Sequence, residues 1–155
     1  EIGSRGTPRI GRAAEVRVGR AVTTGYSGTP LAKKLGFKDG APLWASGMPD
    51  SVKKELDKQV GPRYLARPTK ALGSAHIFHT KAAKLGAELE GLRAKLAPDG
   101  QVWVSWPKKA AKVETDITED TIRELALPLG FVDVKVCAVD EVWSGLKLVI
   151  RKSLR

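Results

Sequence analysis

The sequence predicts an α/β protein built on an open, three-layer, Rossmann-like sheet that is mostly parallel. Three observations predict it: strand-like stretches alternate with helical patterns, residues 102–106 are apolar on both faces, and the chain ends in two strands joined by a short turn. We expect about six strands in the order 2-1-3-4-6-5, the last two forming an antiparallel C-terminal hairpin.

The first half of the chain alternates short helices and strands. Thr29-Pro30 resembles a helix start, and Gly36 a helix end. Asp50 is expected to cap a second helix that Gly61-Pro62 stops. The expected elements are a helix over 31–35, strand one over 42–46, a helix over 50–59, a weak strand two over 64–67 and strand three over 75–79.

The second half has stronger periodicity. Thr80 is expected to cap a long helix over 81–96 that places four leucines on one face. Strand four covers 102–106, after a Pro-Asp-Gly turn. Thr118 caps another helix, which Pro128 and Gly130 end. Strands five and six are expected over 131–139 and 145–151.

The first 21 residues differ from the rest of the chain. They hold five arginines and no lysine, whereas the remainder has sixteen lysines. We expect 1–21 to be a flexible basic tail that is not native, and 22–155 to be a single α/β domain. The alternative is a basic arm that binds nucleic acid.

Charge and composition restrict the function classes. The net charge is +10, which permits contact with nucleic acid, phosphorylated ligands or acidic partners, although a lysine-rich soluble surface would give the same value. Cys137 is the single cysteine, so an internal disulfide is excluded and a reducing compartment is favoured. No apolar run is long enough to span a bilayer, so we expect a cytoplasmic protein without membrane contact.

Two stretches resemble a known fold. Residues 35–43, which enter strand one, and residues 92–151 resemble the corresponding parts of class I S-adenosylmethionine-dependent methyltransferases. The resemblance implies a trimmed methyltransferase-like sheet. Residues 25–36 (Gly-Tyr-Ser-Gly-Thr-Pro-Leu-Ala-Lys-Lys-Leu-Gly), 103–109 (Trp-Val-Ser-Trp-Pro-Lys-Lys) and 143–149 (Trp-Ser-Gly-Leu-Lys-Leu-Val) also resemble an uncharacterised bacterial protein family, which implies no activity.

The chain departs from a working methyltransferase in the half that would hold the cofactor. The turn Ser46-Gly47-Met48-Pro49 lacks the usual glycine pattern. Arg67 stands where an acid would accept hydrogen bonds from the ribose, and one strand–helix unit is missing. We therefore expect no bound S-adenosylmethionine.

A ligand in an open α/β sheet binds beyond the carboxyl ends of the strands, where the strand order reverses. Two lysines beside a tryptophan could hold a phosphate and stack a base, although a buried Trp106 with solvated lysines is the interpretation we favour. The expected ligand-binding residues are Ser46, Gly47, Arg67, Thr80, Trp106, Lys108 and Lys109.

Other reactive side chains have structural explanations. His76 and His79 are three positions apart on a strand and should point to opposite faces, so a zinc site is not expected. Cys137 lies inside an apolar strand, and we expect no catalytic residue. Lysines near the long helix and after strand four could form one basic face: Lys81, Lys84, Lys95, Lys108, Lys109 and Lys112.

Three functions remain open. The first is a non-catalytic protein that binds a partner or a phosphorylated ligand at the strand switch point. The second is a divergent methyltransferase, and the third is a basic nucleic-acid-binding module.

Overall fold

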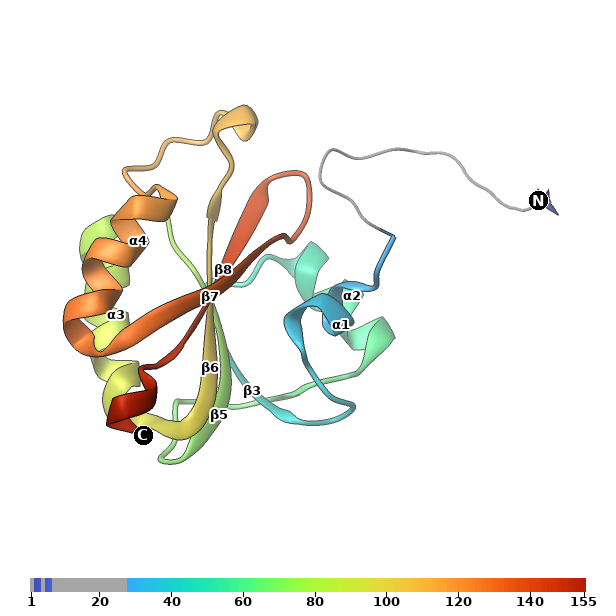
Figure 1. The fold of residues 1–155 in the computed structure, drawn as a ribbon. Coiled ribbons are helices and arrows are strands. Elements are labelled where there is room, and N and C mark those ends of the chain that lie inside the picture. The colour runs from blue at the N-terminus through green and yellow to red at the C-terminus, as the bar shows by residue number, and fades with distance from the viewer. Residues whose placement is uncertain (1, 4, 7–27) are drawn as a thin grey trace.

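The computed structural model describes residues 2–3, 5–6 and 28–155. Residues 28–155 form a six-stranded sheet between two pairs of helices, with α1 and α2 on one face and α3 and α4 on the other (Figure 1). The sheet strands are β3 (Pro42–Ser46), β4 (Arg63–Tyr64), β5 (Leu72–Phe78), β6 (Leu96–Pro107), β7 (Phe131–Ala138) and β8 (Trp143–Ile150). The α-helices are α1 (Leu31–Leu35), α2 (Asp50–Gln59), α3 (Ala82–Lys95) and α4 (Glu119–Ala126).

Shorter elements complete the chain. Three 3₁₀ turns are η1 (Lys109–Ala111), η2 (Leu127–Leu129) and η3 (Lys152–Leu154). A separate two-stranded ladder pairs β1 (Ile2–Gly3) with β2 (Arg5–Gly6). The expected flexible basic tail over 1–21 lies, apart from these four residues, outside the described part of the chain. No helix among the described residues is long and apolar enough to cross a membrane.

The strand order confirms the sequence-based topology. The order is β4-β3-β5-β6-β8-β7, which is 2-1-3-4-6-5 when β3 is counted as strand one. Strands β4, β3, β5 and β6 are parallel, and β8 is antiparallel to both of its neighbours. The carboxyl ends of β3, β5, β6 and β7 consequently lie at one edge of the sheet.

Alternation along the central strands separates two hydrophobic cores. Side chains such as Ile77 and Val104 face α3 and α4, where they pack with the leucine stripe of α3. Phe78 and Trp103 face α1 and α2. The Trp103 indole N–H donates to the Leu35 carbonyl oxygen at 2.8 Å, which attaches α1 to β6.

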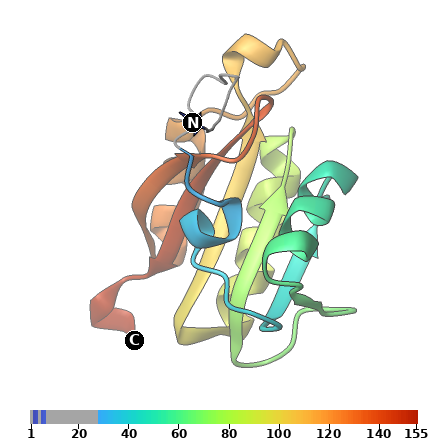
Figure 2. The ribbon, with the colours of Figure 1, turned by 90° about the vertical axis from the view of Figure 1, so that its right-hand side faces the viewer.

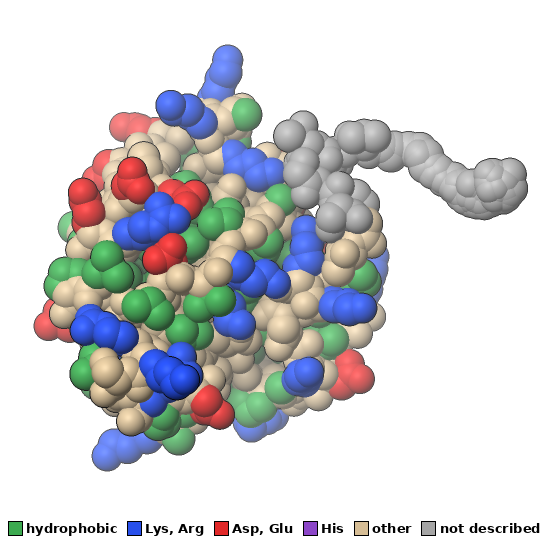
Figure 3. Space-filling view, in the orientation of Figure 1, with side chains coloured by type: hydrophobic (Ala, Val, Ile, Leu, Met, Phe, Trp, Pro, Cys, Tyr) green, Lys and Arg blue, Asp and Glu red, His purple; other side chains and the backbone are tan. Residues whose placement is uncertain are grey.

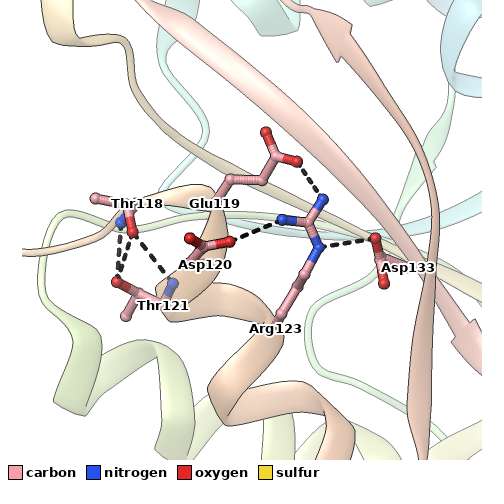
Figure 4. A network of polar contacts seen from close by, with 6 residues as sticks. All are labelled: Thr118, Glu119, Asp120, Thr121, Arg123 and Asp133. Atoms are coloured by element: carbon pink, nitrogen blue, oxygen red, sulfur yellow. Dashed lines mark hydrogen bonds and ion pairs between the residues drawn. The ribbon is translucent and has the colours of Figure 1, made fainter.

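Two sets of polar contacts fix helix α4: a capping box at its start and an ion pair that joins it to β7. Thr118 and Thr121 form a capping box that satisfies backbone N–H groups at the helix start. Arg123 contacts Glu119 and Asp120 of its own helix and donates to Asp133 of β7 at 2.9 Å (Figure 4). The Arg123 guanidinium holds the pKa of Asp133 below its usual value, so this ion pair connects α4 to the sheet.

Two elements differ from the expectation. Strand two is shorter than 64–67, because β4 pairs only with the first two residues of β3. Strand four is longer than 102–106, because Leu96 pairs with Leu72 before a register shift, so the expected turn at 97–100 lies within β6.

A histidine and a serine meet inside the core on the α1 and α2 side. His76 and Ser105 are both 0% exposed, and His76 Nε2 lies 2.7 Å from Ser105 Oγ. The ring also contacts Phe37 and Phe78. Burial lowers the pKa of His76 to about 3, so the side chain is neutral at physiological pH.

Stability should fall with acid because of His76. The unfolded chain takes up a proton on this residue near pH 6.5 and the folded chain only near pH 3, so the free energy of unfolding decreases by up to about 1.4 kcal/mol per pH unit between these values. Urea unfolding of the wild type and of His76→Gln from pH 7 to 4 measures the difference. Parallel pH profiles for the two proteins would contradict it.

Candidate functional site

The parallel strands bring several loops to one edge of the sheet. The chain leaves β3 toward β4 on one side and returns to β5 on the other, so the strand order reverses between β3 and β5. Ligands of open α/β sheets bind above such a point. Ser46 ends β3 here, and His79 directly follows β5.

A half-buried carboxylate from α3 joins these two residues. Glu88 Oε1 accepts from Ser46 Oγ at 3.0 Å and lies 2.6 Å from His79 Nε2, while Oε2 accepts from Trp44 Nε1 at 3.0 Å. The exposed fractions are only 14% for His79 and 19% for Glu88. We call these four residues the Glu88 cluster.

Electrostatics keep Glu88 ionised. Burial acts to raise its pKa, but hydrogen bonds from His79, Trp44 and Ser46 outweigh burial and lower the pKa below its usual value. An ionised carboxylate only accepts hydrogen bonds, so Nε2 of His79 carries the proton. In the neutral ring Nδ1 then has the lone pair, and it can accept a hydrogen bond from a ligand.

The turn after β3 packs closely against the end of β5. Gly47 has φ +67°, and a Cβ atom there would lie 2.8 Å from the carbonyl oxygen of Phe78. In cofactor-binding turns a glycine lets the backbone approach the ligand. Here the absence of a side chain makes room for the end of β5.

The structure brings only some of the expected ligand residues to this edge. Ser46 and Thr80 are there and half-buried, and Gly47 is exposed. Lys108 and Lys109 follow β6, and neither ammonium group has an ion pair with a described side chain.

Trp106 is buried in the core, and Arg67 lies in a loop after a short strand. Trp106 is 8% exposed and packs in the core with α3 and α4, so its ring has no free face for a base, as the favoured interpretation expected. Arg67 follows β4, which ends beside Leu43, and its loop returns to the start of β5 (Figure 2). β4 ends at Tyr64, so Arg67 lies in the loop that follows and not at the end of a strand, where the sequence predicted it.

A side chain distant in sequence accepts a hydrogen bond from the first backbone N–H of α3. Lys81 is the N-cap residue, and Asp116 Oδ1 accepts from the Ala82 N–H at 2.7 Å. The expected cap by Thr80 was wrong, because Asp116 supplies the acceptor and the Thr80 carbonyl accepts from Thr115 Oγ1 and the Asp116 N–H. A carboxylate thus occupies the position where an anion would meet the helix N-terminus.

A groove of about 590 Å³ lies at the same edge on the opposite face of the sheet. It runs between α1 with the residues before it, α2, and the tip of the β7–β8 hairpin, with Val52 and Val139 among its apolar lining. Its volume is within the range of small-molecule sites.

The two histidines do not share a site. His76 faces α1 and α2, and His79 contacts α3 on the other face, which confirms the sequence-based expectation. Within residues 28–155, no group of three His, Cys, Asp or Glu side chains is arranged to hold a metal ion.

The sequence did not identify Glu88. It lies between Leu85 and Leu89 on α3, beside the apolar stripe, and a charged residue there normally marks the solvent side of a helix. Its position next to two strand-end polar residues depends on how α3 packs across β3 and β5.

Comparison with solved structures agrees on the fold. An S-adenosylmethionine-dependent methyltransferase from Aquifex aeolicus superposes with a TM-score of 0.56 at 14% identity, covering 77% of this chain and 87% of the other. This chain has a methyltransferase-like fold. The [4+2]-cyclase SpnF superposes with a TM-score of 0.54 at 9% identity, covering 78% of both chains. No protein-family model and no curated protein sequence matches the chain.

Removing the Glu88 charge should destabilise the protein. Glu88→Gln weakens three hydrogen bonds to a half-buried carboxylate, so we expect a loss of about 1–3 kcal/mol at pH 7. The folded pKa is lowered, so this contribution is present above the unfolded pKa and is lost as the pH falls below about 4.5. Urea unfolding measures it, with the exposed neighbour Glu90→Gln as control; equal losses in both variants would disprove the role.

Gly47 should not tolerate a side chain. Gly47→Ala places a Cβ 2.8 Å from a backbone oxygen and forces an alanine to φ +67°, so we expect a loss of about 1–3 kcal/mol. Gly73→Ala is the control, because nothing lies within 4 Å of its Cβ position. If thermal unfolding shows the same stability for both variants, the turn is not closed on β5.

Proposed function

We propose that this protein binds a ligand at the carboxyl edge of its sheet and is not a conventional methyltransferase. The observation that carries the proposal is the close approach of the turn at Gly47 to β5, where a Cβ atom would lie 2.8 Å from the Phe78 carbonyl oxygen, so that this glycine serves packing within the protein. The sequence after β4 supports it, since residues 65–71 contain no Asp or Glu that could accept hydrogen bonds from a ribose. The usual S-adenosylmethionine arrangement does not fit these residues.

We take the ligand to be a phosphorylated small molecule. Lys108 and Lys109 supply two ammonium groups without described ion-pair partners, and Ser46 and Thr80 supply hydroxyl groups near the switch point. Glu88 already accepts three hydrogen bonds within the protein, so it orients His79 and is not free to accept from a ligand. The single cysteine supports a cytoplasmic location.

The fold itself permits functions other than methyl transfer. One of the similar structures is described as a [4+2]-cyclase. A shared fold therefore does not decide the activity, which depends on the residues at the site.

The alternative function is a divergent methyltransferase. It is supported by the similar structure from Aquifex aeolicus, which is described as S-adenosylmethionine-dependent. In this alternative the ligand would have to enter beside Gly47 in a manner different from the usual turn.

A thermal-shift panel tests the proposal. The probes are S-adenosylhomocysteine, S-adenosylmethionine, adenine and guanine nucleotides, inorganic phosphate and a short RNA. A ligand at a hundred times its dissociation constant adds about 2.7 kcal/mol of stability. We expect stabilisation by a phosphorylated nucleotide and none by S-adenosylhomocysteine.

A pair of double variants locates the site. Lys108→Glu with Lys109→Glu should abolish the nucleotide effect, whereas Lys70→Glu with Lys84→Glu, the same charge change at exposed positions elsewhere, should preserve it. Stabilisation by S-adenosylhomocysteine would establish the alternative. Salt-sensitive stabilisation by RNA alone would instead favour a nucleic-acid-binding module.

A further inference from the structure

The two faces of the β7–β8 hairpin are covered differently. On one face, α4 packs over it through Ile122 and Ala126. On the other, α1 and α2 lie mainly over β3, β5 and β6 (Figure 2), and α1 also packs with Cys137, Val139 and Trp143 at the turn end of the hairpin. The rest of that hairpin face, the open face, carries half-buried and exposed side chains and can contact another molecule.

Two lysines stand opposite each other on the open face. Lys135 of β7 is paired with Lys147 of β8, and Lys147 is paired in turn with Trp103 of β6. Directly paired residues project to the same side of a sheet, and Trp103 belongs to the core on the α1 and α2 side. Both lysines therefore project from the open face.

A third lysine reaches the same area from α1. Lys34 Nζ donates to the carbonyl oxygen of Ala138, at the end of β7, at 2.7 Å. Burial raises the pKa of the Cys137 thiol, and the charges of Lys34 and Lys135 oppose that rise, so both ammonium groups lie near this one side chain. Three positive charges thus gather around the upper part of the hairpin.

These charges are not compensated within the described residues. Neither Lys135 nor Lys147 has an ion pair with a described side chain. Like charges directly opposite on neighbouring strands are destabilising. Figure 3 shows acidic side chains gathered over α4, where Glu119, Asp120 and Asp133 contact Arg123. Glu55, Asp140 and Glu141 line the groove that Lys34 also lines, and none of them is in an ion pair with Lys135 or Lys147.

Apolar side chains continue the open face below the lysines. Val132 and Val149 are paired across the two strands and are both half-buried. Lys34, Lys135, Lys147, Val132 and Val149 together are named the lysine face. It combines positive charge with aliphatic contact area and has no exposed aromatic ring among its residues on which a base could stack.

We propose that the lysine face binds an extended acidic polypeptide segment in which carboxylate and aliphatic side chains alternate. The carboxylates pair with the lysines and relieve their mutual repulsion, while the aliphatic side chains cover Val132 and Val149. The segment lies on the face and does not extend the sheet, because a register shift between Asp133 and Lys135 makes the outer edge of β7 irregular. This binding is independent of the ligand at the carboxyl edge.

Fluorescence anisotropy tests the proposal with a labelled peptide of alternating glutamate and valine. We expect binding that weakens as salt is raised, and a loss of affinity of about tenfold or more in Lys135→Glu with Lys147→Glu, since two attractive contacts become repulsive. Lys70→Glu with Lys84→Glu carries the same charge change and should bind like the wild type. A peptide of alternating lysine and valine should not bind.

Further measurements keep the outcome unambiguous. The single variant Lys147→Glu should form a cross-strand ion pair with Lys135 and so raise the midpoint of thermal unfolding. Such a rise would show that this single variant folds. Equal peptide binding by both double variants would overturn the proposal. So would tighter binding of labelled oligothymidylate through the same two lysines, which would make the lysine face a nucleic-acid surface.

Discussion

The parallel pairing of β3, β5 and β6 is the constraint on which the rest of the structure depends. It places the carboxyl ends of these strands at one edge and sends alternate side chains to two separate cores. Ser46 and His79 come together only because β3 and β5 are neighbours, and α3 then crosses them so that Glu88 reaches both. The same register brings His76 to Ser105 in the opposite core.

The sequence predicted those parts of the fold that depend on local signals. The bounds of β3 and the end of α2 were predicted correctly, because turn residues and proline limit both elements. The expected cap by Asp50 was wrong, because Asp50 is the first residue of α2 and Pro49 is its N-cap. The strand order followed from alternating strands and helices and from the terminal hairpin. Features that depend on distant residues were missed: Asp116, not Thr80, caps α3, and Glu88 belongs to a polar cluster although its helical position indicates the surface.

The candidate site was predicted only in part for the same reason. The turn at Gly47 was identified as lacking the usual glycine pattern, but its close approach to Phe78 could be known only from the packing of β3 against β5. Arg67 was expected at the ligand edge because strand two was predicted over 64–67. The strand ends beside Leu43, since only two residues pair, so Arg67 lies in the loop that follows.

The central claim is that the edge above β3 and β5 does not accept the usual cofactor of this fold. Titration of ¹⁵N-labelled protein with S-adenosylhomocysteine, followed by NMR, tests it most directly. We predict that the amide signals of Gly47, Met48 and His79 do not shift as the concentration rises to saturating levels for a methyltransferase. Saturable shifts confined to these three residues would contradict the account.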